Sequence, residues 1–248
     1  MPRYRIIIEY DGSNYCGWQK QKDLSSVTSE IETAITKFSG ESVDVFGAGR
    51  TDAGVHAKGQ VAHFDLESTK HSPFRIREAL NYHLRKRSIC IILCEEVTSD
   101  FDARFSAIKR HYEYIILNRN ARPALEKNRV WHIKNNLDLN LMQQAANLLI
   151  GKHDFSSFRS SECQASSPIK TIDYITIKMI GDHIFFNIGA RSFLHNMVRN
   201  IVGSLKYVGQ GKMTLAQFEQ GFVSKDRCQM GPTAPAAGLY FMKVEYPS

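Results

Sequence analysis

The sequence predicts an α+β protein made of two halves, in which antiparallel strands carry helices on one side. Two observations predict this class. Segments with an apolar residue at every second position indicate half-buried strands, and segments with apolar residues three or four positions apart indicate amphipathic helices. Both patterns occur in each half of the chain.

The first half begins with a strand over residues 3–10, because its apolar and aromatic residues fall on every second position. The helices are located by their ends: glycine is typical after a helix, and serine followed by proline is typical before one. The further elements predicted here are a helix over 27–38 that ends before Gly40, strands near 43–46 and 60–66, a helix from Pro73 to Leu84 behind the N-cap Ser72, and a strand over 89–93.

The second half repeats this organisation. Tyr112, Tyr114 and Ile116 alternate as a strand, and Gly181-Asp182 predicts a hairpin turn between strands near 175–179 and 184–188. The other elements predicted here are a helix over 141–149, a helix over 197–205 and a last strand over 238–245. We therefore expect two RRM-like, or ferredoxin-like, halves that meet near Ser106, with domains at 1–105 and 106–248.

The composition indicates which kinds of partner and which cellular compartment to expect. The chain has 32 Lys and Arg against 25 Asp and Glu, a net charge of +7, which suits a polyanionic partner such as nucleic acid. No run of about 18 apolar residues predicts a membrane helix, and the first apolar run is too short for a signal peptide. Five irregularly spaced cysteines without a C-x-x-C pair predict a reduced, cytoplasmic protein with neither a zinc site nor a disulfide framework.

A glycine-rich segment, Gly47 to His56, lies between two predicted strands. It does not fit a dinucleotide fingerprint, because Asp52 stands where the third glycine is needed, and it lacks the Lys and Ser or Thr of a P-loop. What remains is a tight loop that presents Arg50 and Asp52. An arginine beside an aspartate keeps the carboxylate ionised, as a nucleophile or a general base requires.

Plainer interpretations compete with a catalytic one. An Arg-x-Asp in a glycine loop is also typical of a structural turn with a surface ion pair, and His56 and His63 fit ordinary polar positions. A glycosidase-like hydrolase would need a second carboxylate, and nothing directs Asp65 or Glu67 towards the loop. A non-catalytic RNA-binding module would account for the charge and for the pair Tyr112 and Tyr114.

The loop and its surroundings resemble a known family. Gly49-Arg50-Thr51-Asp52-Ala53-Gly54-Val55-His56, followed by Gly59-Gln60-Val61, is similar to the signature of the bacterial tRNA pseudouridine synthases of the TruA type. Further family-like blocks follow in family order along the whole chain: Glu9-Tyr10-Asp11-Gly12, Gly17-Trp18-Gln19, Ala103-Arg104-Phe105-Ser106-Ala107, Arg110-x-Tyr112-x-Tyr114, Asp154-Phe155-Ser156-Ser157-Phe158, His195-Asn196-Met197-Val198-Arg199-Asn200 and Ala237-Gly238-Leu239-Tyr240.

The resemblance implies isomerisation of uridines at positions 38, 39 and 40 of the tRNA anticodon stem-loop to pseudouridine. It implies no metal, no organic cofactor, and a homodimer in which one tRNA touches both subunits. The matching positions make Asp52 the catalytic residue, as nucleophile or base, and Arg50 its ion-pair partner. Tyr112 would stack on the target base, Leu239 would line the pocket, and Arg199 would be a second arginine near the carboxylate. The second domain would then complete the active-site cleft.

Recognition of tRNA is expected to depend on shape and phosphates. The basic residues expected to contact RNA are Lys58, Arg75, Arg77, Lys109, Arg110, Arg122 and Arg129. Two departures from the family pattern affect this footprint. The segment Leu84 to Ile89 lacks the usual proline and is strongly basic, and Asp102 stands where some members carry histidine.

Overall fold

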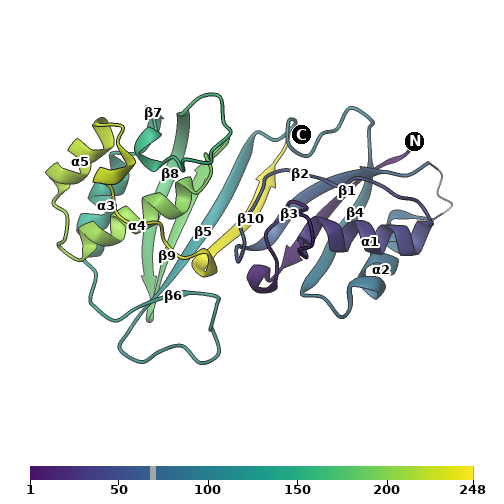
Figure 1. The fold of residues 1–248 in the computed structure, drawn as a ribbon, viewed down its shortest axis with the longest axis horizontal. Helices are drawn as coiled ribbons and strands as arrows, with labels where there is room; N and C mark the ends of the chain where they lie inside the picture. Colours follow the sequence, from purple (N-terminus) through teal and green to yellow (C-terminus); the bar gives the residue numbers. More distant parts are fainter. Residues whose placement is uncertain (68–70, 248) are drawn as a thin grey trace. The chain divides into compact units, whose positions relative to one another are not determined.

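The computed structural model describes residues 1–67 and 71–247, which divide into two compact units (Figure 1). Unit 1 comprises Met1–Ile108 and Tyr240–Ser248, and unit 2 comprises Lys109–Leu239. The chain first crosses between the units three residues after the position expected from the sequence. The last segment belongs to unit 1, whereas the sequence analysis assigned it to the second domain.

Unit 1 contains a mixed sheet in the order β4-β1-β3-β10. The strands are β1 (Arg3–Tyr10), β3 (His56–Asp65), β4 (Ile89–Val97) and β10 (Leu239–Glu245), and the two-residue β2 (Phe46–Gly47) pairs with β3. The pairs of β1 with β3 and with β4 are antiparallel, and β10 runs parallel to β3.

Two helices of unit 1, α1 (Val27–Ser39) and α2 (Pro73–Leu84), pack against each other and lie side by side in Figure 1. Their ends agree with the predictions, because Ser26 and Ser72 accept hydrogen bonds from the first turns and Gly40 adopts the left-handed conformation. The alternating residues of β1, from Tyr4 to Tyr10, are all buried as expected.

The opposite face of this sheet carries a second, smaller apolar cluster. Ala48, Val61 and Ala103 are buried there, with Phe101 and Tyr246 packed against them. Residues before and after unit 2 in the sequence therefore contribute to one cluster within unit 1. Long-range contacts of this kind leave no periodic pattern in the sequence.

Two strand predictions in unit 1 need correction. The segment 43–46 was expected to be a strand, but the structure has only β2, Phe46–Gly47. The strand expected at 60–66 begins earlier, at His56, because His56 and Ala57 pair with Tyr240 and Phe241 of β10. A partner nearly two hundred residues away determines that strand end.

Unit 2 contains an antiparallel sheet in the order β5-β9-β8-β7. Its strands are β5 (Lys109–Asn118), β7 (Gly151–Asp154), β8 (Ile169–Ile180) and β9 (His183–Ala190), and β6 (Trp131–Ile133) pairs in parallel with β5. The hairpin predicted at Gly181-Asp182 is confirmed, and Gly181 has φ +58° at the turn.

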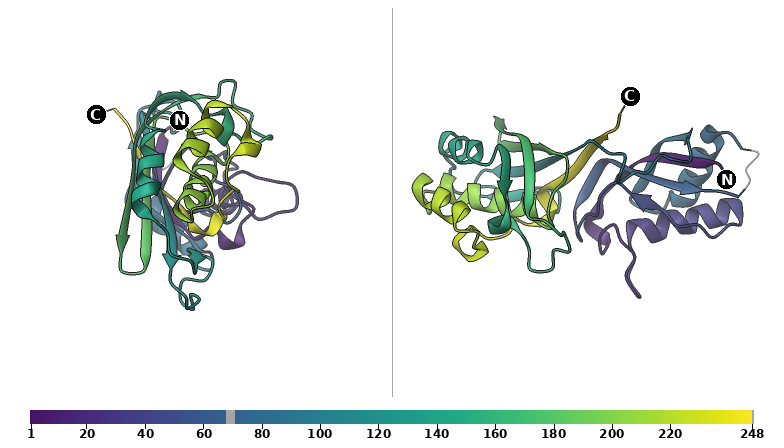
Figure 2. Two further views of the ribbon diagram at one scale, coloured as in Figure 1. Left: turned by 90° about the vertical axis from the view of Figure 1, so that its left-hand side faces the viewer. Right: turned by 90° about the horizontal axis from the view of Figure 1, so that it is seen from above.

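Three helices complete unit 2: α3 (Leu139–Asn147), α4 (Met197–Gly209) and α5 (Leu215–Val223). In Figure 2, α4 and α5 lie against one face of the unit 2 strands. The helix α4 is buried along most of its length, including the polar residues Asn200 and Ser204. The elements β6, β7 and α5 are absent from the sequence prediction.

Short 3-10 turns connect the larger elements. They are η1 (Gly12–Asn14), η2 (Ser156–Phe158), η3 (Arg227–Gln229) and η4 (Ala236–Gly238). Within the described part of the chain, none of the helices is both long and apolar enough to cross a membrane.

Candidate active site

The glycine-rich loop that carries Asp52 joins β2 to β3 in unit 1. Backbone hydrogen bonds hold it at both ends: the Ala48 N–H donates to the Val61 carbonyl (2.8 Å), and the Val55 N–H donates to the Asp52 carbonyl (3.1 Å). Gly54, inside this turn, has φ +78°, a conformation that favours glycine. The loop is therefore a fixed turn that leads directly into β3.

A second glycine segment lies against the loop. Gly17 forms an isolated antiparallel bridge with Asp52, and the Trp18 N–H donates to the Thr51 carbonyl at 3.0 Å. A Cβ atom on Gly17 would lie 2.6 Å from the Thr51 oxygen, and Gly17 has φ +112°. Only glycine fits between the two backbones, so the Gly17-Trp18 block and the Asp52 loop form one structural unit.

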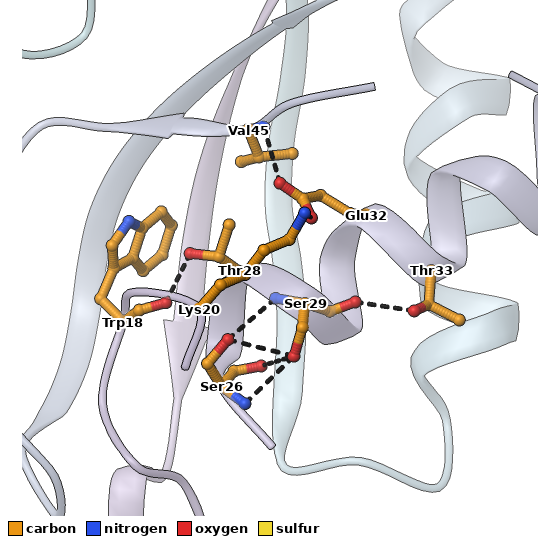
Figure 3. Close-up of polar contacts among 8 residues, drawn as sticks. All are labelled: Trp18, Lys20, Ser26, Thr28, Ser29, Glu32, Thr33 and Val45. Carbon is orange, nitrogen blue, oxygen red and sulfur yellow. Dashed lines mark hydrogen bonds and ion pairs between the residues drawn. The ribbon is translucent and has the colours of Figure 1, made fainter. Parts of the chain in front are cut away.

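The N-terminal part of α1 holds the Trp18 backbone through hydrogen bonds (Figure 3). The Trp18 carbonyl accepts hydrogen bonds from both the N–H and the Oγ1 of Thr28. Glu32, one turn further along, is buried; it accepts the Val45 N–H at 3.1 Å and forms an ion pair with Lys20. The helix is thus joined both to the Trp18 segment and to the chain that enters β2.

Buried polar side chains from β1 and β3 also hold the loop. The Tyr10 hydroxyl and Thr51 Oγ1 are 2.8 Å apart, and Gln60 Nε2 donates to the Gly49 carbonyl at 2.8 Å. Tyr10, Thr51 and Gln60 are all buried, and burial raises the pKa of Tyr10 to about 12. Buried hydrogen bonds of this kind fix a loop because breaking one leaves an unsatisfied polar group. The residues on both sides of Arg50 are held in place.

His56 adds a further bond at the start of β3. It is buried, its Nδ1 accepts the Gly12 N–H at 3.1 Å, and its ring stacks on Tyr240 at 4.8 Å between centroids. These contacts join the segment before Gly17, the loop and the returning strand β10. His56 therefore helps to hold the Asp52 loop in place.

Arg50 is exposed and Asp52 is half-buried on this support. A half-buried carboxylate can be reached by a substrate, and electrostatic interactions are stronger there than in bulk water. A carboxylate held in this way can act as a nucleophile or as a general base.

The other candidate residues belong to unit 2. Tyr112 lies on β5 opposite Ile188 of β9, and its half-buried ring meets Phe193 edge-on at 5.0 Å. Leu239, at the start of β10, is buried. The fully buried tyrosine of β5 is Tyr114, whose hydroxyl donates to a backbone carbonyl, so Tyr112 is the more accessible of the two.

Arg199 lies in the first turn of α4 and is half-buried. Its Nε donates to the Ala234 carbonyl (2.8 Å), its Nη1 donates to Asn196 Oδ1 (2.7 Å), and the Ala234 N–H donates back to the Arg199 carbonyl (3.1 Å). Asn196 has φ +60°, which is uncommon for a residue other than glycine. These bonds hold the guanidinium in a defined position.

Comparison with known proteins agrees with the resemblance. The model of the family described as tRNA pseudouridine synthase matches residues 6–106 and 145–247. The chain belongs to the tRNA pseudouridine synthase family. The match includes the whole loop around Asp52 and most of both units.

Close relatives extend the match over the full chain. Proteins named tRNA pseudouridine synthase A are 49% identical in Parvibaculum lavamentivorans and 51% identical in Rhodopseudomonas palustris strain BisA53, over 99% of this chain and 100% of each relative. The Agrobacterium fabrum protein of the same name is 48% identical over 100% of this chain and 93% of its own length. A solved structure titled "Crystal Structure of a Cbf5-Nop10-Gar1 Complex" aligns with 82% of this chain and 54% of its own, with 10% identity and a TM-score of 0.34.

The basic residues expected to contact RNA divide into two groups. Lys58, Arg75, Arg122 and Arg129 are exposed. The others are less exposed: Arg77 pairs with Glu78 (2.9 Å), Lys109 pairs with Asp173 (3.0 Å), and Arg110, which is 8% exposed, donates to the Arg191 carbonyl (2.7 Å). The burial of Arg110 makes it the least accessible of this set.

The supporting residues of the loop were not assigned a role from the sequence. Tyr10 was expected only as a core residue of the first strand, and Gln60 only as part of the signature. A signal was present, because Gln60 is a polar residue within an apolar strand, and buried polar side chains require partners.

Proposed function

We propose that this protein converts uridines at positions 38, 39 and 40 of the tRNA anticodon stem-loop to pseudouridine, with Asp52 as the catalytic carboxylate. One observation carries the proposal: the family signature Gly49 to His56 forms a loop held by Gly17, Tyr10 and Gln60, and Asp52 lies half-buried on it.

The reaction rearranges one nucleotide without loss of atoms. The bond from N1 of uracil to C1′ breaks, a bond from C5 to C1′ forms, C5 loses a proton and N1 gains one. Asp52 either attacks C1′, forming a covalent sugar ester that the turned base displaces, or removes the C2′ proton as the base leaves. In the second route the resulting glycal is attacked at C1′ by C5 of the turned base, and the proton returns to C2′. Both routes require the carboxylate to be ionised, and we assign Arg50 as its ion-pair partner.

The target base must leave the helical stack to reach the carboxylate, which costs a few kcal/mol. We assign Tyr112 to stacking on the extruded base, because stacking on an aromatic ring recovers about 1–3 kcal/mol. Leu239 would line the base pocket and exclude water, and Arg199 would provide a second positive charge. The bonds of Arg199 to Ala234 and Asn196 support a fixed orientation for it.

Four exposed basic residues are assigned to tRNA binding. Lys58, Arg75, Arg122 and Arg129 are exposed basic residues, suited to phosphate contacts that position the RNA. We also propose, from the family resemblance, that two copies of the chain bind one tRNA together. Light scattering of the protein with and without tRNA measures this directly.

Release of tritium from tRNA labelled at C5 of uridine tests the proposal, because the C5 hydrogen is lost when pseudouridine forms. Purified protein is expected to release tritium from a transcript containing uridines 38–40, without free uracil. Release of free uracil would identify a hydrolase, and binding without either product would identify a non-catalytic RNA-binding protein.

A further inference from the structure

A short turn at the end of unit 1 is closed by four hydrogen bonds. Asp102 Oδ1 accepts the N–H groups of both Arg104 (2.7 Å) and Phe105 (2.8 Å). The Ser106 N–H donates to the Asp102 carbonyl (3.0 Å), and the Asp102 N–H donates to Ser106 Oγ (3.0 Å). An aspartate that accepts from the two following N–H groups is a strong local constraint on the backbone.

The turn is also anchored to the sheet through Ala103, which is fully buried. The Ala103 N–H donates to Nδ1 of His63 on β3 at 3.1 Å, and the Ala103 carbonyl accepts from the hydroxyl of Tyr246 at 2.8 Å. Contacts from two distant parts of the sequence therefore fix the residue next to Arg104.

This fixed turn presents an aromatic ring outward. Phe105 is 77% exposed, and the guanidinium carbon of Arg104 lies 5.4 Å from its ring centroid. Exposure of one apolar residue is common in proteins. Here, however, six hydrogen bonds hold the backbone that exposes it, and an arginine accompanies the ring.

We propose that Phe105 and Arg104 form a stacking platform for an unpaired nucleobase of the tRNA substrate. Aromatic rings and arginine planes are the surfaces on which proteins stack single-stranded or extruded bases. The arginine supplies charge complementary to the RNA backbone. The inference rests on the proposed function for the identity of the RNA and adds a binding element outside the Asp52 loop.

The proposal also gives Asp102 a role as a positioning residue. Asp102 contacts no substrate in this account; it holds the peptide groups of Arg104 and Phe105 and so fixes the direction of the platform. The conservative change Asp102→Asn keeps an oxygen acceptor at this position, whereas Asp102→Ala removes it.

The test compares three forms of the full chain: the unchanged protein, Phe105→Leu, which keeps an apolar side chain without the aromatic face, and Phe105→Trp, which enlarges that face. The probe is an anticodon stem-loop RNA, and a fully paired RNA duplex of equal length serves as the control ligand. We expect Phe105→Leu to raise Kd and KM for the stem-loop about tenfold. Phe105→Trp is expected to bind the stem-loop within about twofold of the unchanged protein.

Further readouts separate stacking from a structural effect. The thermal midpoints of the two Phe105 variants and their affinity for the duplex should be unchanged, because the Phe105 side chain is exposed and a duplex offers no free base. The single-turnover rate at saturating protein should also be unchanged. Asp102→Ala should weaken stem-loop binding as Phe105→Leu does, and Asp102→Asn should restore it. As a matched surface control, Val223→Ala changes an apolar residue that is 70% exposed on α5 and should leave binding unaffected.

Equal stem-loop affinity of Phe105→Leu and the unchanged protein would overturn the proposal, as would failure of Phe105→Trp to retain affinity. Loss of self-association in Phe105→Leu with unaltered RNA affinity would also overturn it and assign the ring to a contact between copies. If one of these results is found while the unchanged protein forms pseudouridine on the stem-loop, the stacking proposal is wrong and the proposed function stands. If the unchanged protein forms no pseudouridine on this RNA, the proposed function is wrong.

Discussion

The hydroxyl groups of Tyr10 and Thr51 lie 2.8 Å apart in the interior of unit 1. Tyr10 belongs to β1, and Thr51 lies between Arg50 and Asp52, so this contact connects the sheet to the loop that carries the candidate carboxylate. Because both residues are buried, the contact cannot be replaced by water without moving the loop.

Replacement of Tyr10 by phenylalanine should therefore lower both the stability of the fold and the turnover. We expect Tyr10→Phe to lower the free energy of unfolding by about 0.5–1.5 kcal/mol and kcat by about tenfold, since Thr51 loses its fixed partner. Tyr4→Phe is the matched control, because Tyr4 is equally buried on the same strand and its ring packs beside Phe64, whereas the Tyr10 hydroxyl contacts Thr51. Urea denaturation and tritium release measure the two effects, and equal turnover in both variants would contradict the role of Tyr10.

Gly17→Ala tests the close approach of the two glycine segments. The new Cβ would lie 2.6 Å from the Thr51 oxygen, so the loop must shift, and we expect a loss of activity of about a hundredfold. Gly40→Ala is the control, because Gly40 also has a positive φ of +79°, but among the residues that the structure describes no atom beyond its chain neighbours lies within 4 Å of its Cβ position. Both variants carry the same kind of backbone strain, so unequal activity measures the steric effect on the loop; equal losses would refute it.

The stability of unit 1 should depend on pH through His63. Burial lowers the pKa of His63 below its ordinary value of 6.5. Above pH 6.5 the ring is neutral in both the folded and the unfolded chain, and its full contribution is present. As the pH falls below 6.5, the unfolded chain binds the proton first, so the free energy of unfolding decreases until the folded-state pKa is passed.

Urea denaturation between pH 7.5 and pH 5 measures this loss in the unchanged protein and in His63→Gln, which does not titrate. The difference in the free energy of unfolding between the two should decrease as the pH falls. A constant difference across this range would contradict the prediction. Asp65, whose pKa is lowered by its hydrogen bond to Arg3, contributes in a separate window, with its stabilisation lost only below its ordinary value of 3.8.

Exposed and buried arginines of the proposed RNA footprint should behave differently. Arg75→Ala should weaken tRNA binding and reduce the slope of log K against log salt by about one unit if Arg75 contacts one phosphate. Arg110→Ala should instead lower the free energy of unfolding by about 1–3 kcal/mol, because Arg110 is buried and donates to the Arg191 carbonyl. Salt titrations of tRNA binding, combined with denaturation, distinguish the two; a reduced salt slope in Arg110→Ala would place that residue on the RNA.

Local sequence patterns predicted the elements whose ends depend on nearby residues. Ser26 and Gly40 determine the ends of α1, and the Gly181-Asp182 turn determines the hairpin of β8 and β9. The strands β6 and β7 could not be predicted in this way, because three or four residues are too few to show an alternating pattern. The membership of β10 in unit 1 depends on pairing with His56 and Ala57, a contact that no local pattern contains.

The candidate site shows the same division. The signature around Asp52 identified the loop, because its residues are contiguous. Its supports, Tyr10, Gln60 and Gly17, also lie in family-like blocks, but their contacts with the loop are recognised only when the fold brings these segments together. The buried polar groups near a site are thus harder to predict than the exposed residues that they hold.

The central claim is that the carboxylate of Asp52 performs the chemistry. The most direct measurement compares pseudouridine formation and tRNA binding in Asp52→Asn with those in the unchanged protein, with Asp44→Asn as an exposed control on the chain that enters the loop. The account predicts that Asp52→Asn binds tRNA with unchanged affinity while turnover falls at least about a thousandfold, and that Asp44→Asn retains full turnover. Turnover within about tenfold of the unchanged protein in Asp52→Asn would contradict it.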